Sequence, residues 1–525
     1  MKSYQKHLSS TMAYGENEEL TKKPILRSSG IFPVVKNQNY SSRILFLGYW
    51  FIKRNIPEVG LIITLRDQKG KILQRKLQSI DSVKAFTIEL DTLLNEINHT
   101  SKEFLGSIEA EFNTTRDMVF PYPALVLEYY NSDFNTCVHT IERIYNDFED
   151  LQENEQSKVP ESGFDIYNTS DLQSFVSFVN GPITNSDGFV EYVITNLKSE
   201  KISGTIHLGK IDPYETKFFK FDDYITNLTE ILGNESGSIS LKHNFEGFYP
   251  RLLVGNIQKS FPSVSFTHSY YDCSLCNSEI DYWNRIDDTF FDSSVYVPLF
   301  VSDNYYTDLV LYPNFSPSDF TLQIDLYNKQ GNKIHSNEKF LDVTSNVSKL
   351  SKIHFKKIIE ENNLNINEIC SAHLITKFKD QKIASRIKFG LNIGISGLKS
   401  KLPCNICFNT KMGNPHIENK PGSFHWSPIF LKKSSTITIV NFSPKKNYKQ
   451  NANIEINFYR KEDSLHVSKN ISLKPFEEFR IIPDKKLIDF LKDDGWITLK
   501  SDNPNIQGFY FNFHPSGAVA GDHFF

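Results

Sequence analysis

The sequence predicts an all-β protein made of four tandem antiparallel β-sandwich domains, with short helical turns and one connector helix. Three observations lead to this fold class. Only 9 of the 525 residues are alanine, the best helix former, whereas 42 are phenylalanine, which favours strands. Apolar and polar residues alternate over short segments, as at Ile454, Ile456 and Phe458, which is the period of a half-buried strand. One order of strands and turns also recurs along the chain.

The fourth unit shows this order most clearly. It contains two strands, a hairpin at residues 460–464, a third strand, a short acidic helical turn, and then two further strands separated by a turn. The residues that follow the helical turn are spaced by 131, 133 and 125 positions: Gly106, Gly237, Cys370 and Gly495. This period has the length of a domain rather than of a solenoid repeat. We expect the three glycines to end the helical turn with a positive φ, and Cys370 to be a small buried hydrophobe.

Units of about seven short strands are typical of antiparallel sandwiches. The predicted organisation is a polar N-terminal segment at 1–30, sandwich unit 1 at 31–136, a helical connector at 137–163, unit 2 at 164–274, a connector at 275–291, unit 3 at 292–400, a connector at 401–420 and unit 4 at 421–525.

The first connector carries apolar residues at helical spacing. This spacing predicts a short amphipathic helix, which could pack against a neighbouring sandwich or dock a partner. The residues that form the stripe are Ile141, Ile144, Tyr145, Phe148 and Leu151.

The fourth unit resembles the sensory rhodopsin transducer family over residues 424–514. The resemblance rests on the segments ITIVNFSP, INFY, SLKPFEEFRI and ITLKSDNPNIQGFYFNFH, and the other three units fit more loosely. It implies a small β-sandwich module that binds or oligomerises through its surface. It transfers no active site.

Charge and composition restrict the compartment and the partners. The net charge of −4 gives no basic footprint, so we expect no nucleic-acid partner. No apolar stretch approaches the length of a membrane span, and the first 30 residues show no apolar core of a secretory signal. Six cysteines in 525 residues are typical of a reducing compartment. We therefore expect a soluble, cytoplasmic protein.

Two connectors each carry a CxxC pair, and this spacing lets two thiolates bind one tetrahedral Zn²⁺. The pairs are Cys273 with Cys276, and Cys404 with Cys407. If equivalent loops brought both pairs together, they would form a four-thiolate site. The alternative is that all four are free thiols with no cofactor, because the pairs lie much farther apart in sequence than in compact zinc ribbons.

His268 and Asp272 follow the last expected strand of unit 2. A carboxylate can orient a histidine for acid–base chemistry, so the pair is a candidate catalytic site. No nucleophile elbow or phosphate-binding glycine motif accompanies it. The alternative is that His268 is a hydrogen-bonded residue at the end of a strand.

Aromatic residues near the connectors could stack on sugar rings or anchor a protein partner, but inter-domain packing also uses such residues. The candidate ligand-binding residues are Tyr270, Tyr271, Tyr282, Trp283, His425 and Trp426.

These patterns favour a non-catalytic binding or scaffolding protein that recognises a glycan or a protein partner through loops between its domains. One alternative is an enzyme of polysaccharide or nucleotide-sugar metabolism with its site at His268 and Asp272. Another is a structural subunit of a larger assembly, such as a homo-oligomer, because exposed sheet edges can pair between chains.

Overall fold

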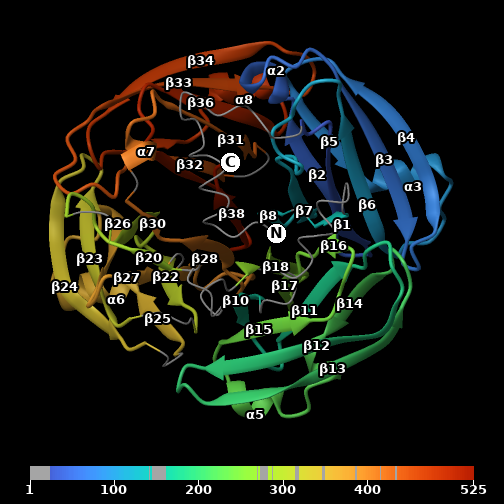
Figure 1. The fold of residues 1–525 in the computed structure, drawn as a ribbon, viewed down its shortest axis with the longest axis horizontal. Helices are drawn as coiled ribbons and strands as arrows, with labels where there is room; N and C mark the ends of the chain where they lie inside the picture. The colour runs from blue at the N-terminus through green and yellow to red at the C-terminus, as the bar shows by residue number, and fades with distance from the viewer. Residues whose placement is uncertain are drawn as a thin grey trace.

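The computed structural model describes residues 24–140, 142–144, 161–268, 270–271, 282–285, 288–313, 318–345, 349–384, 387–413, 415–431 and 434–525. These residues form an all-β protein, as the sequence predicts, in which the main sheets are antiparallel. Four two-sheet units lie around a common centre and follow one another in chain order (Figure 1).

Each unit consists of two sheets of four principal strands. In the first unit the outer sheet has the order β1-β6-β3-β4 and the inner sheet has the order β5-β2-β7-β8. The strands are β1 (Arg27–Lys36), β2 (Ser41–Leu47), β3 (Val59–Asp67), β4 (Ile72–Ile80), β5 (Ala85–Glu89), β6 (Phe104–Asn113), β7 (Val126–Tyr130) and β8 (Asn135–His139).

The second unit repeats both orders, with sheets β13-β12-β15-β10 and β14-β11-β17-β18. Its strands are β10 (Glu161–Ile166), β11 (Leu172–Val179), β12 (Asn185–Asn196), β13 (Lys201–Ile211), β14 (Thr216–Lys220), β15 (Gly237–His243), β17 (Leu253–Gln258) and β18 (Ser263–His268).

The third and fourth units have the same two sheet orders, β24-β23-β26-β21 with β25-β22-β28-β29, and β31-β36-β33-β34 with β35-β32-β37-β38. Unit 3 contains β21 (Ser293–Pro298), β22 (Tyr305–Leu311), β23 (Phe320–Asn328), β24 (Lys333–Val343), β25 (Ser351–His354), β26 (Ile369–Phe378), β28 (Lys388–Ile395) and β29 (Cys404–Asn409). Unit 4 contains β31 (Ser423–Ile429), β32 (Ser434–Asn441), β33 (Ala452–Tyr459), β34 (His466–Leu473), β35 (Glu478–Ile481), β36 (Gly495–Ser501), β37 (Ile506–Phe513) and β38 (Val519–His523).

Short elements complete the described chain. The predicted helical turns are confirmed, because one precedes the sixth strand of every unit. The helices are α2 (Trp50–Lys53), α3 (Leu90–Glu96), α5 (Leu228–Leu232), α6 (Phe355–Glu361), α7 (Pro415–Glu418), α8 (Lys485–Leu491) and the 3-10 turn η2 (Phe221–Asp223). The two- and three-residue strands are β9 (Arg143–Ile144), β16 (Phe248–Tyr249), β19 (Tyr270–Tyr271), β20 (Tyr282–Asn284), β27 (Lys382–Ala384) and β30 (Lys411–Met412). None of the described helices has the length and apolarity that crossing a bilayer requires.

The recurring glycine has a different role from the one expected. Gly106 lies inside β6, Gly237 and Gly495 each open the sixth strand of their unit, and none of the three has a positive φ. A Cβ atom on Gly106 would lie 2.1 Å from the carbonyl oxygen of Arg66, and one on Gly495 would lie 2.5 Å from that of Tyr459. Glycine is therefore required by the close approach of the neighbouring strand, not by a helix cap.

The expected connectors contain strands. Strand β8 runs past the predicted end of unit 1, and β29 occupies the start of the predicted connector at 401–420. The predicted helix is wrong at Ile144, which lies in β9 and pairs with Phe248 of β16. The other stripe residues of that connector lie outside the described residues. Among the described residues, each unit thus has eight principal strands rather than about seven.

The four units form a closed ring. The hairpin between the third and fourth strands of one unit contacts the start of the fifth strand of the next. The backbone N–H of Thr216 donates to the carbonyl of Gln68 at 2.9 Å, and that of Glu478 donates to the carbonyl of Lys329 at 3.1 Å. The same contact joins the last unit to the first, where the N–H of Ala85 donates to the carbonyl of Arg460 at 3.0 Å.

Apolar packing follows the same closure. One cluster of buried side chains contains core residues of unit 1, such as Phe112, together with core residues of unit 4, such as Trp496. A second cluster joins the core of unit 3 to Phe442 and Phe511 of unit 4. Neighbouring units therefore share buried apolar cores and are not separate, independently packed domains.

Candidate functional site

The eighth strand of each unit lies at the centre of the ring. Strand β8 contacts β18 and β38, and β29 contacts the same two strands. These strands occupy the middle of the molecule, whereas the outer-sheet edge strands β4, β13, β24 and β34 lie at its periphery (Figure 1). Three of the four central strands end in histidine: His139, His268 and His523.

His139 is held by a buried carboxylate from the opposite end of the chain. Asp522 Oδ2 accepts a hydrogen bond from His139 Nδ1 at 2.7 Å and another from the His139 backbone N–H at 2.8 Å. Burial opposes ionisation of Asp522, but the His139 contacts outweigh it and lower its pKa to about 2. Because an ionised carboxylate can only accept, His139 Nδ1 carries a proton that points at Asp522, and Nε2 is the ring nitrogen that can meet another partner.

His523 has the same tautomer for a different reason. Its Nδ1 lies 2.8 Å from the carbonyl oxygen of Phe524, which can only accept, so Nδ1 carries the proton. Burial lowers the pKa of His523 to about 4, with a further contribution from His139. At neutral pH this ring is uncharged, and its Nε2 is a lone-pair donor.

The three rings lie against one another. The His139 ring centre is 4.2 Å from that of His523 and 4.9 Å from that of His268. Donor atoms of His139, Asp522 and His523 all lie within 4.8 Å of one another. The side chain of His139 is 22% exposed, so the cluster reaches solvent at its edge. We call His139, His268, Asp522 and His523 the axial cluster.

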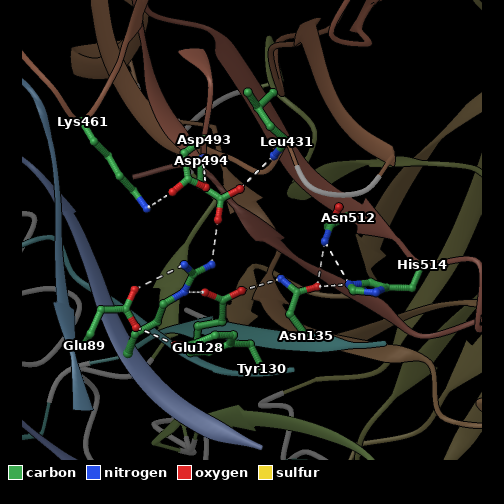
Figure 2. A network of polar contacts seen from close by, with 11 residues as sticks. Glu89, Glu128, Tyr130, Asn135, Leu431, Lys461, Asp493, Asp494, Asn512 and His514 are labelled. Carbon is green, nitrogen blue, oxygen red and sulfur yellow. Dashed lines mark hydrogen bonds and ion pairs between the residues drawn. The ribbon is translucent and has the colours of Figure 1, made fainter. Parts of the chain in front are cut away.

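A buried ion network joins units 1 and 4 at the seam next to the axial cluster, and the network is drawn in Figure 2. Arg43 on β2 pairs with Glu128 on β7 and, across the seam, donates from Nη2 to Asp494 Oδ2 at 2.7 Å. The Arg43, Glu128 and Asp494 side chains are only 6%, 1% and 5% exposed. Burial works against the charge of Arg43, but the two carboxylates raise its pKa above the ordinary value.

Hydrogen bonds extend the network toward the axis (Figure 2). Asn135 Nδ2 donates to Glu128 Oε1 at 2.7 Å, and Asn135 Oδ1 accepts from Asn512 Nδ2 at 2.8 Å and lies 2.7 Å from His514 Nε2. Burial raises the pKa of Glu128, although Arg43 partly offsets this effect. The same central strand, β8, thus carries both the seam network through Asn135 and the axial cluster through His139.

Of the predicted catalytic pair, His268 lies among the described residues and Asp272 does not. His268 is buried at the end of β18, and the ring that it meets is that of His139. The placement of His268 agrees with a strand-end histidine and brings no nucleophile to it among the described contacts.

The second predicted zinc pair does not have the geometry of a chelate. Cys404 and Cys407 are three residues apart in strand β29, so their side chains point to opposite faces of the sheet. Cys404 lies in the core of unit 3 with Ile406 and Phe408, and burial raises its pKa to about 12. Cys407 Sγ instead lies 3.1 Å from the position that a Cβ on Gly163 would take. Cys273 and Cys276 lie outside the described residues.

Of the six candidate ligand-binding residues, the two whose side chains are described are used for packing. Trp426 is 5% exposed; its ring stacks on Tyr49 of unit 1 with centres 4.7 Å apart, and Lys53 Nζ lies 4.2 Å from its ring centre. His425 Nδ1 lies 3.0 Å from the carbonyl oxygen of Phe525. The side chains of the other four candidates lie outside the described residues: Tyr270, Tyr271, Tyr282 and Trp283.

The sequence-based reasoning missed His139, Asp522 and His523. Asp522 and His523 lie in the central strand β38, to which the sequence analysis assigned no site. A comparison of the last strand of each repeat would have shown the recurring terminal histidine, had the eighth strand been recognised. No known protein family matches the chain, and no curated protein matches it either.

Proposed function

We propose that this protein is a non-catalytic binding or scaffolding protein and that its ligand is a protein partner. The observation that carries the proposal is the closure of the ring. Contacts between successive units recur around the molecule and also join the last unit to the first, so four outer surfaces are held in a fixed arrangement. Such a frame suits the simultaneous display of several contact surfaces.

One cavity among the described residues offers little room for a substrate. This cavity lies between units 2 and 3, is lined in part by Asp165, Asn256 and Asn392, and has a volume of about 10 Å³. This is room for about one water molecule, whereas ligand pockets measure roughly 300–1,000 Å³. The size of this cavity favours binding on the outer surface over catalysis at this place.

A protein partner is favoured over a glycan by the position of Trp426. Its buried ring stacks on Tyr49 and leaves no open face for a sugar. The periphery instead presents apolar side chains on strands that are paired on one side only among the described residues, such as Leu77 on β4, which is 74% exposed, and Val467 on β34, which is 43% exposed. Exposed strand edges recognise extended protein segments through backbone hydrogen bonds.

The test is chemical cross-linking with mass spectrometry on the full chain in an extract of its source cells. We expect a stoichiometric partner with cross-links to Lys76 on β4 or Lys469 on β34. Leu77→Lys together with Val467→Lys should abolish capture, because a buried lysine is costly in an apolar contact. Tyr224→Lys, at another exposed apolar position, is the matched control and should capture normally.

Two other results would redirect the proposal. Binding on a glycan array by the wild-type chain would restore the glycan alternative. Self-association of the purified chain that Leu77→Lys and Val467→Lys prevent would indicate a structural subunit that assembles through its edges.

A further inference from the structure

The axial cluster brings together metal-binding donors from two distant parts of the chain. His139 ends β8 in unit 1, while Asp522 and His523 end β38 in unit 4. Their donor atoms lie within 4.8 Å of one another. Ligands around a tetrahedral Zn²⁺ lie about 3.3 Å apart, given Zn–N and Zn–O distances near 2.0–2.1 Å. The ligand atoms would therefore have to move closer together when an ion binds.

The hydrogen bonds of His139 and His523 occupy Nδ1 of each ring, so Nε2 is the atom that can bind a metal. Nδ1 of His139 is occupied by Asp522 and Nδ1 of His523 by the carbonyl of Phe524. A histidine ligand in a metal site typically donates its other N–H to a carboxylate or a backbone carbonyl, and both kinds of partner are present here. The tautomers are therefore set before any ion binds.

The donor set also selects the kind of ion. Imidazole ligands suit Zn²⁺ and related divalent transition metals, whereas Ca²⁺ and Mg²⁺ require oxygen ligands. His268 adds a third imidazole whose ring centre is 4.9 Å from that of His139. The partial exposure of His139 provides a path to solvent.

We propose that His139 and His523, oriented by Asp522 and the carbonyl of Phe524, bind one divalent transition metal ion of the Zn²⁺ type, and that this ion clamps unit 1 to unit 4. The ligands come from the two central strands on either side of the seam, β8 and β38. The metal therefore acts as a cross-link at the one place where the ring is closed by units that are not consecutive in the chain. This inference is independent of the proposed partner.

The experiment uses the tag-free full chain carrying Cys273→Ser and Cys276→Ser, so that these thiols do not contribute. After treatment with a chelator, the protein is titrated with Co²⁺, followed by its visible absorption, and with Zn²⁺ in competition with a chromophoric chelator. We expect one ion per chain. His139→Gln and His523→Gln should each weaken binding at least tenfold, and Asp522→Asn should weaken it about 10- to 100-fold.

His466→Gln, at an exposed histidine on β34, is the matched control and should bind like the parent. Thermal unfolding in excess chelator establishes that each variant folds. Zn²⁺ should raise the unfolding temperature of the parent and of the control but not of His139→Gln or His523→Gln. Amide hydrogen exchange in β8 and β38 should slow on addition of Zn²⁺.

The metal site is refuted if the parent binds no stoichiometric ion, or if His139→Gln and His523→Gln bind as tightly as the parent does. If an ion binds but leaves exchange in β8 and β38 unchanged, the clamp is refuted. If the ion binds only to the chain that keeps Cys273 and Cys276, the proposal is also overturned, because the metal would then be held by those thiols.

Discussion

Replacing Arg43 by methionine tests whether the buried network closes the ring. Methionine keeps most of the aliphatic volume but removes the charge that faces Glu128 and Asp494, whose side chains are 1% and 5% exposed. Asn135 and the Leu431 backbone N–H still donate to these carboxylates, the latter at 2.8 Å. The carboxylates nevertheless lose their only close cation described here, Arg43.

The magnitude follows from burial. At an effective dielectric constant near 20, each pair at about 4 Å contributes roughly 4 kcal/mol of Coulomb energy, most of which offsets desolvation. Removing one partner of a buried pair costs about 3–5 kcal/mol, because the remaining charge stays buried. We expect Arg43→Met to reduce the free energy of opening the seam by this amount.

The loss of seam stability in Arg43→Met should depend on pH. Without Arg43, burial raises the pKa of Glu128 further above its value in the unfolded chain. A group with a raised folded pKa stabilises the fold at low pH and loses that contribution as the pH rises through the folded pKa. The deficit of Arg43→Met should therefore be largest at neutral pH and smaller near pH 4.5.

The assay is native-state hydrogen exchange, because a chain of four units need not unfold in two states. The amides to follow are those of Leu431, which donates to Asp494, and His139, which donates to Asp522. A loss of about 3–5 kcal/mol corresponds to exchange faster by about a hundred- to several thousand-fold. Circular dichroism at neutral pH checks that the variant keeps its strand content.

Lys461→Met is the matched control at the same seam. Lys461 Nζ lies 3.1 Å from Asp493 Oδ2, but the two side chains are 26% and 38% exposed, so the pair contributes at most about 1 kcal/mol. If Arg43→Met accelerates exchange no more than Lys461→Met does, the network does not hold the seam and the reasoning fails.

Three further predictions concern buried groups. His373, 2% exposed between the rings of Phe442 and Phe476, has its pKa lowered to about 3 by burial. Below pH 6.5 the unfolded chain binds a proton at His373 that the folded chain does not bind. The free energy of unfolding therefore decreases as the pH is lowered, by about 2 kcal/mol at pH 5. Acid titrations monitored by fluorescence should show that His373→Phe lacks this loss. Trp426→Ala should cost about 3–5 kcal/mol and Trp426→Phe much less, as measured by thermal unfolding. Cys404 should resist iodoacetamide at pH 8 in the folded chain and react on unfolding, as peptide mass spectrometry will report, because its pKa is raised to about 12.

Each of these predictions can fail on its own. An unchanged acid midpoint in His373→Phe would show that this ring is protonated in the fold or solvated. A Trp426→Ala variant with the unfolding temperature of the wild type would mean that the Tyr49 stack contributes little at the seam. Rapid labelling of Cys404 under native conditions would show that the core of unit 3 opens readily.

Local sequence determined the strands, their repetition and the fold class. The alternation of Ile454, Ile456 and Phe458 is visible without any knowledge of neighbours, and in β33 these residues are indeed buried while Glu455 between them is exposed. The helical turns were also predictable, since each repeat places an apolar run between its fifth and sixth strands. Such features depend on interactions between residues close in sequence.

The central strands were not predictable in the same way. Asn135–His139 and Val519–His523 are short and are covered on both faces, by their own sandwich and by neighbouring units, so they lack the alternation of a half-buried strand. The structural role of Gly106 and Gly495 could not be predicted either, because the atoms that exclude a Cβ belong to another strand.

The sequence by itself therefore determined that this protein is four copies of a β-sandwich, and only the tertiary structure decided that the copies close into a ring. Closure depends on the rotation between successive units, which no local pattern records. It brings Arg43 to Asp494 and His139 to Asp522 across more than 380 residues of chain. The physical reason is that the energy of a buried charge depends on its neighbours in space, and here those neighbours lie at the two ends of the described sequence.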